Sequence, residues 1–538
     1  MSKTIDSLFD AEQDAPFRLW KRASSSIEIN QNDIIFQAPL FTAAPKKKTW
    51  KERYFVLTAK RLYLLKSEHE PQILAYMDTQ WVRIDFIMPK ASTGDTNGFC
   101  FKFIRNMVFT DLWTDDEDHF NEWVKHFSQV FILCNFHHKY NTIKMIGKGS
   151  FARVYMVEHK ETQVKYAVKA FNKEYLMSQP KGKDSLINEM EILQSIKHPH
   201  IMNLVEMHES KNSIYLVLEL LEGGELFSFI SKRKKLTYSD VTMIMAGILK
   251  ALAYMASKKI IHRDLKPDNL LFKSLESCEI KIADFGLATR CDVNDYLYKR
   301  CGTPGFIAPE VINASSKTHM PFTPKCDVFS AGVVFHILLT GDPIFMGKTY
   351  SEIIVKNKQC KIKFSHPMLK KNKVALDLLT RMLEVDPEKR ITAEEALKHK
   401  FFEKIGTDEL YKGDVEIYND HQFENMEYRK MIVKDKEKEK PEVSSLIIRN
   451  PVFNGKTDTV KDSFDSSGLI SSFKSMNTPK KGKERLSKRE SVLKYTLLNK
   501  VNKELETVYG SNLASEYFCS TSEDISDKEG DYCPDINK

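Results

Sequence analysis

The sequence predicts an α+β protein with more than one folded unit. Its 538 residues are too many for a single hydrophobic core, and 42% of them are hydrophobic, which is enough to fill several cores. Short runs with β character, such as RYFVL and FCFKFI, occupy residues 34–135 and end in one helical pattern. From residue 140 to residue 402, strand-like runs come first and many helical patterns follow. This change places a domain boundary between residues 135 and 140.

Residues 34–135 predict a small antiparallel barrel or sandwich that is capped by one C-terminal helix. The helix corresponds to DEDHFNEWVKHFSQVF. Trp123 in this helix is expected to pack on the sheet rather than to form a site, because an aromatic residue on the inner face of a single capping helix normally packs there. Residues 1–33 are mixed and polar without a clear period, so we expect a flexible N-terminal segment.

Residues 403–538 predict a mostly disordered tail. Ser, Lys, Asp and Asn dominate it, and Lys434–Lys440 reads KDKEKEK, a composition that cannot bury enough apolar surface. Within it, residues 480–508 are basic and place leucines at helical spacing. Such a helix is a candidate calmodulin target, membrane-surface helix or autoinhibitor, and a partly helical linker is the alternative.

Charge and cysteine usage narrow the class of protein. The formal net charge of +8 permits contact with anionic surfaces, but no stacking-aromatic pattern for nucleic acid accompanies it, so we expect no nucleic-acid partner. The nine cysteines are scattered without a C-x-x-C pair, and the first ten residues lack a secretory pattern. We therefore expect a reduced, cytoplasmic setting.

Three modest signals follow one another after residue 140. Gly147 and Gly149 lie between strand-like flanks, where glycines let backbone N–H groups approach phosphate oxygens. A tight hairpin without a ligand explains them equally well. Lys169 in YAVKAF and Glu189 in INEMEIL each fit a solvent-exposed position when taken alone. Each signal is modest alone, but their order and spacing make the three informative when they are taken together.

Residues 140–402 resemble the eukaryotic protein kinase family. The motifs GKGSFARV, AVK, HRDLKPDN, DFG, APE and DVFSAG arrive in the order typical of that family, and Arg390 follows them. The resemblance implies a bilobal fold: a small lobe of five strands and one helix, joined to a larger helical lobe, with ATP and Mg2+ in the cleft.

The resemblance also implies the role of each motif residue. Asp264 would accept the hydroxyl proton of the substrate, Lys266 would stabilise the moving phosphoryl group, and Asn269 with Asp284 would hold Mg2+. Glu310 and Arg390 would form a structural ion pair. Ala152 stands where the family usually has a third glycine. The ATP-binding set implied by the resemblance is Ile146, Gly147, Lys148, Gly149, Ser150, Phe151, Ala152, Arg153, Val154, Lys169, Glu189, Glu219, Leu221 and Glu225.

The loop sequence LKPDN is typical of Ser/Thr kinases. Glu225 in EGGELF matches an acid that meets an arginine before the acceptor residue, and Asp268 adds a second negative charge. We therefore expect protein substrates with basic residues before the acceptor, although Glu225 could instead contact only the ATP ribose. CGTPGFIAPE and GGELF resemble the calcium/calmodulin-dependent kinase group.

Residues 34–135 resemble a pleckstrin homology domain through KKKTWKERYFVLTAKRLYLL and Trp123. The resemblance implies that a phosphoinositide-containing membrane is bound by Lys51 and Arg53, and that the protein is recruited there. Thr42 stands where the family has a first-strand lysine, and Lys46, Lys47 and Lys48 are electrostatic substitutes. The alternative is a folded module that binds a protein or nothing tightly.

Arg263 precedes the catalytic aspartate, and in many kinases this arginine binds a phosphate on the activation segment. Here the usual phosphate-bearing position is Lys299, and Thr303 matches a threonine that bonds the catalytic loop. Asp292 and Asp295 are the acids that could supply the missing charge. The sequence therefore predicts that phosphorylation of this segment is not required; Tyr296 and Tyr298 leave a minority route through a tyrosine kinase.

Three functional hypotheses follow. The first is an active, membrane-recruited Ser/Thr kinase. The second is a pseudokinase or a phosphoinositide-binding signalling scaffold, against which the intact set of Lys169, Asp264, Asn269 and Asp284 argues. The third is a basic adaptor for anionic lipids or RNA, with the kinase fold incidental.

Overall fold

The computed structural model describes residues 7–10, 17–24, 26–43, 50–89, 98–149, 151–233, 235–293, 296–298, 300–314, 322–403 and 416–419. All of them belong to one of the chain's two compact units, and the other unit, residues 430–519, lies outside the described residues. The predicted basic helix at residues 480–508 is therefore outside them as well.

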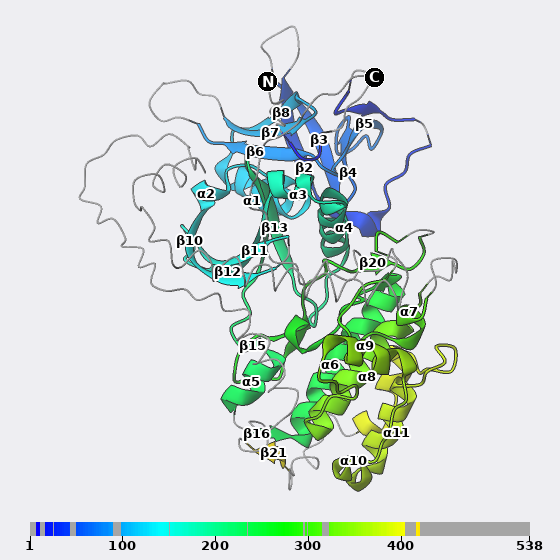
Figure 1. Ribbon diagram of the computed structural model, residues 1–538. Coiled ribbons are helices and arrows are strands. Elements are labelled where there is room, and N and C mark those ends of the chain that lie inside the picture. Colours follow the sequence, from blue (N-terminus) through cyan, green and yellow to red (C-terminus); the bar gives the residue numbers. More distant parts are fainter. Residues whose placement is uncertain are drawn as a thin grey trace, which may run out of the picture. The chain divides into compact units, whose positions relative to one another are not determined.

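The first module is an antiparallel sheet, as predicted. Among the described residues the sheet is not closed into a barrel, because β5 and β6 do not pair. Asn106 and Met107, both with positive φ (49° and 62°), form the two-residue turn between β7 and β8, a backbone that matches the twist of the strands. The strands, labelled in Figure 1, are β2 (Ile34–Ala43), β3 (Trp50–Thr58), β4 (Arg61–Leu65), β5 (Ile73–Asp78), β6 (Arg83–Ile87), β7 (Phe99–Arg105) and β8 (Val108–Thr114).

Helix α1 (Glu117–Val130) covers the sheet with an aromatic face. Asp116 caps its N-terminus by accepting a hydrogen bond from the backbone N–H of His119 at 2.6 Å. Trp123 is fully buried and stacks on Phe127 with a ring-centroid distance of 4.6 Å. The prediction that Trp123 belongs to the core is confirmed.

Part of the segment before residue 34, which we expected to be flexible, is packed. Strand β1 (Lys21–Arg22) pairs with β5, and Leu19 joins the core of the first module. A short 3₁₀ turn, η1 (Gln31–Asp33), leads into β2. After α1, strand β9 (Ile132–Leu133) pairs in parallel with β6 and with β13 of the kinase-like region, and helix α2 (Phe136–Lys139) follows.

The kinase-like region begins with the predicted small lobe of five strands, in the order β13-β14-β12-β11-β10. It has two helices where the family resemblance implied one, because a short helix precedes the long one. The elements are β10 (Tyr140–Lys148), β11 (Arg153–His159), β12 (Lys165–Asn172), α3 (Lys173–Ser178), α4 (Gly182–Ser195), β13 (Leu204–Glu209) and β14 (Ser213–Glu219).

The larger lobe is helical around α6 and α8, which lie against each other (Figure 1). Helix α6 is long and apolar enough to cross a membrane, but most of it is buried, as expected for a core helix. The helices are α5 (Leu226–Arg233), α6 (Tyr238–Ser257), α7 (Pro309–Ile312), α8 (Lys325–Thr340), α9 (Tyr350–Gln359), α10 (Pro367–Lys371), α11 (Lys373–Met382) and α12 (Ala393–Leu397), with the 3₁₀ turns η2 (Pro267–Asn269) and η3 (Lys400–Phe402).

Short strand pairs fix the loops of this lobe. Strand β18 pairs with β15 and β19, and β17 pairs with β20. Strand β21, in the predicted tail, pairs with β16. The bounds are β15 (Gly224–Glu225), β16 (Lys235–Thr237), β17 (Ile260–Ile261), β18 (Leu270–Phe272), β19 (Ile280–Ile282), β20 (Thr289–Arg290) and β21 (Glu416–Asn419). The overall class, a bilobal α+β fold behind a small β module, is confirmed.

Candidate active site

The loop HRDLKPDN is held between two short buried strands, β17 and β18. Asp327, almost fully buried in the first turn of α8, fixes the loop backbone. Its carboxylate accepts hydrogen bonds from the backbone N–H groups of His262 at 2.6 Å and Arg263 at 2.9 Å. Sequence reasoning gave Asp327 no role beyond its place in the motif DVFSAG. The structure shows that this carboxylate anchors the loop.

The side chain of Asp264 lies among donors from three places. Thr303 donates its hydroxyl to Oδ1 at 2.6 Å, and Lys266 Nζ lies 3.0 Å from Oδ2. Asn269 Nδ2 donates to the backbone oxygen of Asp264 at 2.8 Å and to Oδ2 at 3.2 Å. The carboxylate is thus fixed in one orientation, and Thr303 bonds the loop as the sequence predicted.

Lys169 joins the two lobes by contacting two carboxylates. Its Nζ lies 2.7 Å from Glu189 Oε1 on α4 and 2.9 Å from Asp284 Oδ1, just after β19. Phe285, the next residue, is buried and meets the His262 ring edge-on at 5.0 Å. The structure therefore brings together Lys169, Glu189 and Asp284, which lie far apart in the sequence.

Charge determines the titration of this cluster. The cation of Lys169 holds the pKa of Asp284 well below its usual range. Burial opposes the charge on Lys169, but Asp284 and Glu189 together raise its pKa. Burial and the nearby charge of Asp284 raise the pKa of Glu189, and the attraction of Lys169 does not fully offset them. Asp284 is thus the carboxylate that stays ionised most readily.

Arg263 and Asp284 adopt left-handed backbone conformations, with φ of 66° and 59°. Non-glycine residues pay about 1–3 kcal/mol for such sparsely populated conformations, which persist where the surroundings enforce them. Arg263 directly precedes Asp264 in the chain, and Asp284 contacts Lys169. The strain therefore coincides with the region that the sequence assigns to chemistry.

The glycine-rich segment forms a hairpin between β10 and β11. Gly149 N–H donates to the backbone oxygen of Ala152 at 2.8 Å, so the residue in place of the third glycine closes the turn. Ser150 lies outside the described residues. The remaining described members of the predicted set lie on the two strands and the turn: Ile146, Gly147, Lys148, Phe151, Arg153 and Val154.

Glu219 ends strand β14, which pairs with β12 and β13, and Leu221 lies two residues further along the chain. The Glu219 carboxylate accepts the backbone N–H of Asn203 at 2.7 Å and lies 2.9 Å from Lys281 Nζ. Its side chain is therefore committed to the protein, and a nucleotide could use only its backbone. Leu221 is nearly buried.

The two acids predicted to meet a basic substrate come from neighbouring elements. Glu225 ends β15, Asp268 lies in η2, and these two elements are in contact. Both side chains are half-buried. Further from the cleft, Arg390 forms the expected bidentate pair with Glu310 at 2.6 and 2.9 Å.

Among the described residues, backbone oxygens and an aromatic ring hold the Arg263 side chain, and no acid does. Its Nε and Nη1 donate to the backbone oxygens of Leu287 at 2.8 Å and Tyr298 at 2.5 Å, and its guanidinium lies 5.5 Å from the ring centroid of Tyr296. Asp292 does not supply the missing charge, because its carboxylate binds Arg290 at 2.7 and 2.9 Å. Lys299 and Asp295 lie outside the described residues.

In the first module, Lys51 and Arg53 lie on β3, and Lys46, Lys47 and Lys48 lie outside the described residues. Thr42 pairs with Lys51 across β2 and β3 and donates its hydroxyl to the Lys51 backbone oxygen at 3.1 Å. Successive strand residues face opposite sides, so Lys51 and Arg53 share the face opposite to Glu52.

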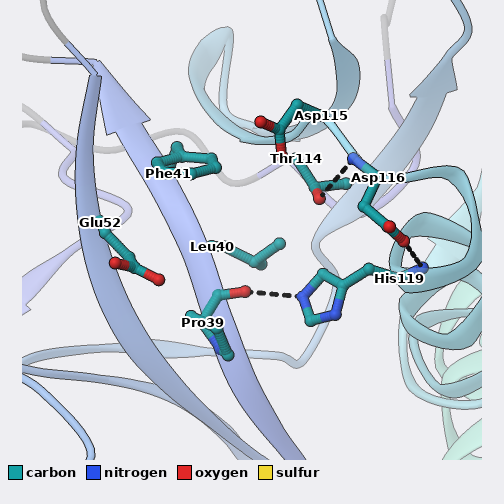
Figure 2. A pocket seen from close by; sticks show the side chains of 8 residues that line it. All are labelled: Pro39, Leu40, Phe41, Glu52, Thr114, Asp115, Asp116 and His119. Carbon is teal, nitrogen blue, oxygen red and sulfur yellow. Dashed lines mark hydrogen bonds between the residues drawn. The ribbon is translucent and has the colours of Figure 1, made fainter.

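Glu52 belongs to a cavity of 380 Å³ beside the start of α1, and Figure 2 shows its lining. There His119 Nε2 lies 2.7 Å from the backbone oxygen of Pro39. Because several acids line this cavity, an anionic head group is disfavoured there. The lining residues are Pro39, Leu40, Phe41, Glu52, Thr114, Asp115, Asp116 and His119.

Comparison with known proteins agrees with both modules. The protein kinase domain model matches residues 140–402, and the PH domain model matches residues 34–131. Calcium-dependent protein kinase 4 of Plasmodium falciparum (isolate 3D7) is 36% identical over 298 residues, which are 54% of this chain and 55% of the relative. The chain thus spans about half the length of this relative and of its counterpart in Plasmodium berghei (strain Anka).

Two further relatives are covered over more of their length. Phosphorylase b kinase gamma catalytic chain, liver/testis isoform, of Mus musculus is 32% identical over 50% of this chain and 68% of the relative. Myosin light chain kinase A of Dictyostelium discoideum is 38% identical over 47% of this chain and 84% of the relative. The chain therefore belongs to the protein kinase family and carries a PH domain ahead of its kinase domain.

Proposed function

We propose that this chain transfers the terminal phosphoryl group of ATP to Ser or Thr residues of proteins. The arrangement of Asp264 carries the proposal: Thr303 and Asn269 hold its carboxylate beside Lys266, and Lys169 and Asp284 belong to the same site. Phosphoryl transfer needs alignment and neutralisation of charge more than covalent help from the protein. The fixed carboxylate provides the alignment, and the lysines neutralise the charge.

Each side chain then has a separate task. Asp264 accepts the proton of the attacking hydroxyl and aims it, while Lys266 stabilises the negative charge of the group in transfer. Burial opposes the charge of Lys266, but Asp264 raises its pKa, so the ammonium form persists at neutral pH. Lys169 contacts the ATP phosphates, and Glu189 fixes its position.

The donor set fits Mg2+. Asp284 offers a carboxylate, and Asn269 uses its Nδ2 towards Asp264, which leaves the amide oxygen for a metal. No group of three or more His, Cys, Asp or Glu residues with metal-binding arrangement occurs in the part of the chain that the structure describes. This agrees with Mg2+ held by one or two protein ligands together with substrate phosphates. Bound Mg2+ would supply charge neutralisation at those phosphates.

We further propose that substrates carry basic residues before the acceptor. Support comes from Glu225 and Asp268, two acids on contacting elements at the entrance to the loop. The PH domain would recruit the chain to phosphoinositide-containing membranes through Lys51 and Arg53. Support for that role is electrostatic: the two cations share one face of β3, away from the acidic cavity.

Calmodulin remains a candidate regulator at residues 480–508, which lie outside the described residues. The name of the Plasmodium relative refers to calcium, and that describes the relative alone. Support for the proposal in this chain is the basic, leucine-spaced sequence.

Replacing the proposed base tests the chemistry. Asp264→Asn should keep the fold and ATP binding and lower turnover on a basic peptide about 10²–10⁴-fold, because proton transfer by a positioned side chain contributes that much. Lys169→Met should impair phosphate positioning. The exposed Asp118→Asn in the PH domain serves as the control and should leave turnover unchanged. Wild-type turnover in Asp264→Asn or in Lys169→Met would refute the kinase assignment.

The activation segment should work without phosphate. Among the described residues, two backbone oxygens and the ring of Tyr296 already hold the Arg263 side chain, so a phosphate is not needed to position it. Protein stripped with phosphatase, with a bare segment verified by mass spectrometry, should retain its peptide phosphorylation rate. Near-complete loss of activity that is restored by a phosphate on the segment would contradict this.

Lipid binding should depend on the β3 cations. The full chain should bind phosphoinositide-containing vesicles in a sedimentation assay, and affinity should fall as salt rises. Lys51→Ala with Arg53→Ala should abolish binding. As a control, Lys60→Ala with Lys125→Ala removes the same charge from other exposed positions of the domain, and vesicle binding should be unchanged. Equal binding to neutral vesicles would argue for a protein-binding module.

Residues 480–508 of the tail should inhibit the kinase activity of the chain. Truncation after Gly406 should raise basal activity, and truncation after Asn419, which keeps β21, should raise it equally if residues 480–508 are the inhibitor. A synthetic peptide of residues 480–508 should bind calmodulin only with calcium. Unchanged activity in both truncations, together with no calcium-dependent binding, would dismiss the hypothesis.

A further inference from the structure

The PH domain and the small kinase lobe share one sheet. Strand β9 lies between β6 of the PH domain and β13 of the kinase domain, parallel to both. Ile132 N–H donates to the backbone oxygen of Val82 at 3.1 Å, and Cys134 N–H donates to Ile84 at 3.1 Å. A recruitment module on a flexible linker would not need backbone pairing with the enzyme. The junction is therefore a structural element of the small lobe.

A buried carboxylate fastens this junction. Glu209, at the end of β13, has a side chain that is only 1% exposed. It accepts hydrogen bonds from Ser7 Oγ at 2.7 Å and from the backbone N–H of Leu8 at 2.8 Å, and it pairs with Lys173 Nζ at 2.6 Å. Arg83 Nε of the PH domain lies 3.7 Å away. Burying a carboxylate is costly unless its partners are in place, so the cluster requires these segments to assemble together.

The N-terminal segment Ser7–Asp10 links the two domains. At one end Ser7 and Leu8 contact Glu209 of the kinase domain. At the other end Phe9 stacks on Trp81 at 4.7 Å, and Asp10 accepts the backbone N–H of Asn106 at 2.8 Å, both in the PH domain. The same short segment thus binds both sides of the junction.

The PH domain also contacts helix α4, which carries Glu189. Gln80 Nε2 donates to Glu191 Oε1 at 2.7 Å, and Gln194 Nε2 donates to the backbone oxygen of Val130 at 3.3 Å. Glu191 and Gln194 are three residues apart and therefore share one face of the helix. Two points of contact on one face limit both rotation and translation of α4.

We propose that the PH domain positions helix α4 for catalysis, with Gln80 and Gln194 as positioning residues. The contacts coexist with a formed pair between Lys169 and Glu189 at 2.7 Å, so the docked arrangement supports activity rather than opposing it. The effect passes through Glu189, because that carboxylate fixes the lysine that meets the ATP phosphates. The inference rests on the proposed kinase function and adds a second role for the PH domain, independent of lipid.

An exchange of donor and acceptor tests the contact in the full-length chain. Gln80→Glu removes the amide donor and sets a second carboxylate beside Glu191. It should lower kcat/KM for peptide phosphorylation at least about fivefold, which corresponds to one hydrogen bond of about 1 kcal/mol. Combining Gln80→Glu with Glu191→Gln restores the bond in the opposite sense and should recover most of the rate. Gln72→Glu, at an exposed PH position, is the matched control and should have no effect.

Hydrogen exchange provides a readout that does not need activity. Amides of α4 should exchange faster in Gln80→Glu and return towards wild-type rates in the exchanged pair, while amides of α8 should not change. Wild-type kinetics and wild-type α4 exchange in Gln80→Glu would overturn the inference, as would an exchanged pair that recovers neither. If the wild-type chain phosphorylates no peptide, the proposed function fails, and the exchange rates of α4 alone decide the positioning claim.

Discussion

The contact of Lys169 with two carboxylates is the constraint on which the rest of the site depends. Its ammonium group, on strand β12, meets Glu189 from helix α4 and Asp284 from the segment after β19. This one cation therefore joins the small-lobe sheet, the small-lobe helix and the large lobe. Without this cation, the almost fully buried carboxylate of Glu189 would be left unpaired, which is strongly destabilising. The position of the lysine is consequently set by every element that positions its two partners.

The large lobe supplies the other fixed half of the site. Asp327 holds the backbone of the catalytic loop, and Thr303 holds the side chain of Asp264 from the activation segment. These bonds are made before any substrate arrives, so little reorganisation remains for the reaction. The guanidinium of Arg263 is bound by backbone oxygens and an aromatic ring, which gives the activation segment its own source of order. Rigid support on both sides explains how a site with few catalytic groups can align two reactants.

Sequence reasoning predicted most of what local pattern and family motifs determine. Runs of strand and helix character revealed the two modules, and the motif order placed Lys169, Asp264, Asn269 and Asp284 in one site. The lack of pairing between β5 and β6 was not predictable, because strand patterns do not specify whether a sheet closes.

Contacts between segments that are distant in sequence could not be predicted either. Nothing in the polar residues 1–33 marked Ser7 and Leu8 as partners of Glu209, and a lone glutamate at a strand end looks like a surface residue. The role of Asp327 had a signal in DVFSAG, but a backbone anchor is visible only once the loop is placed beside it. Asp292 was a plausible source of charge until its nearer partner, Arg290, was seen.

A double-mutant cycle on Lys169 and Glu189 tests the central claim most directly. The rates of peptide phosphorylation would be measured for Lys169→Met, Glu189→Gln and the combined variant, after verifying that each is folded. If Glu189 acts only by fixing Lys169, the combined variant should be no slower than Lys169→Met alone. Losses that multiply in the combined variant would contradict the account, because the two residues would then act independently.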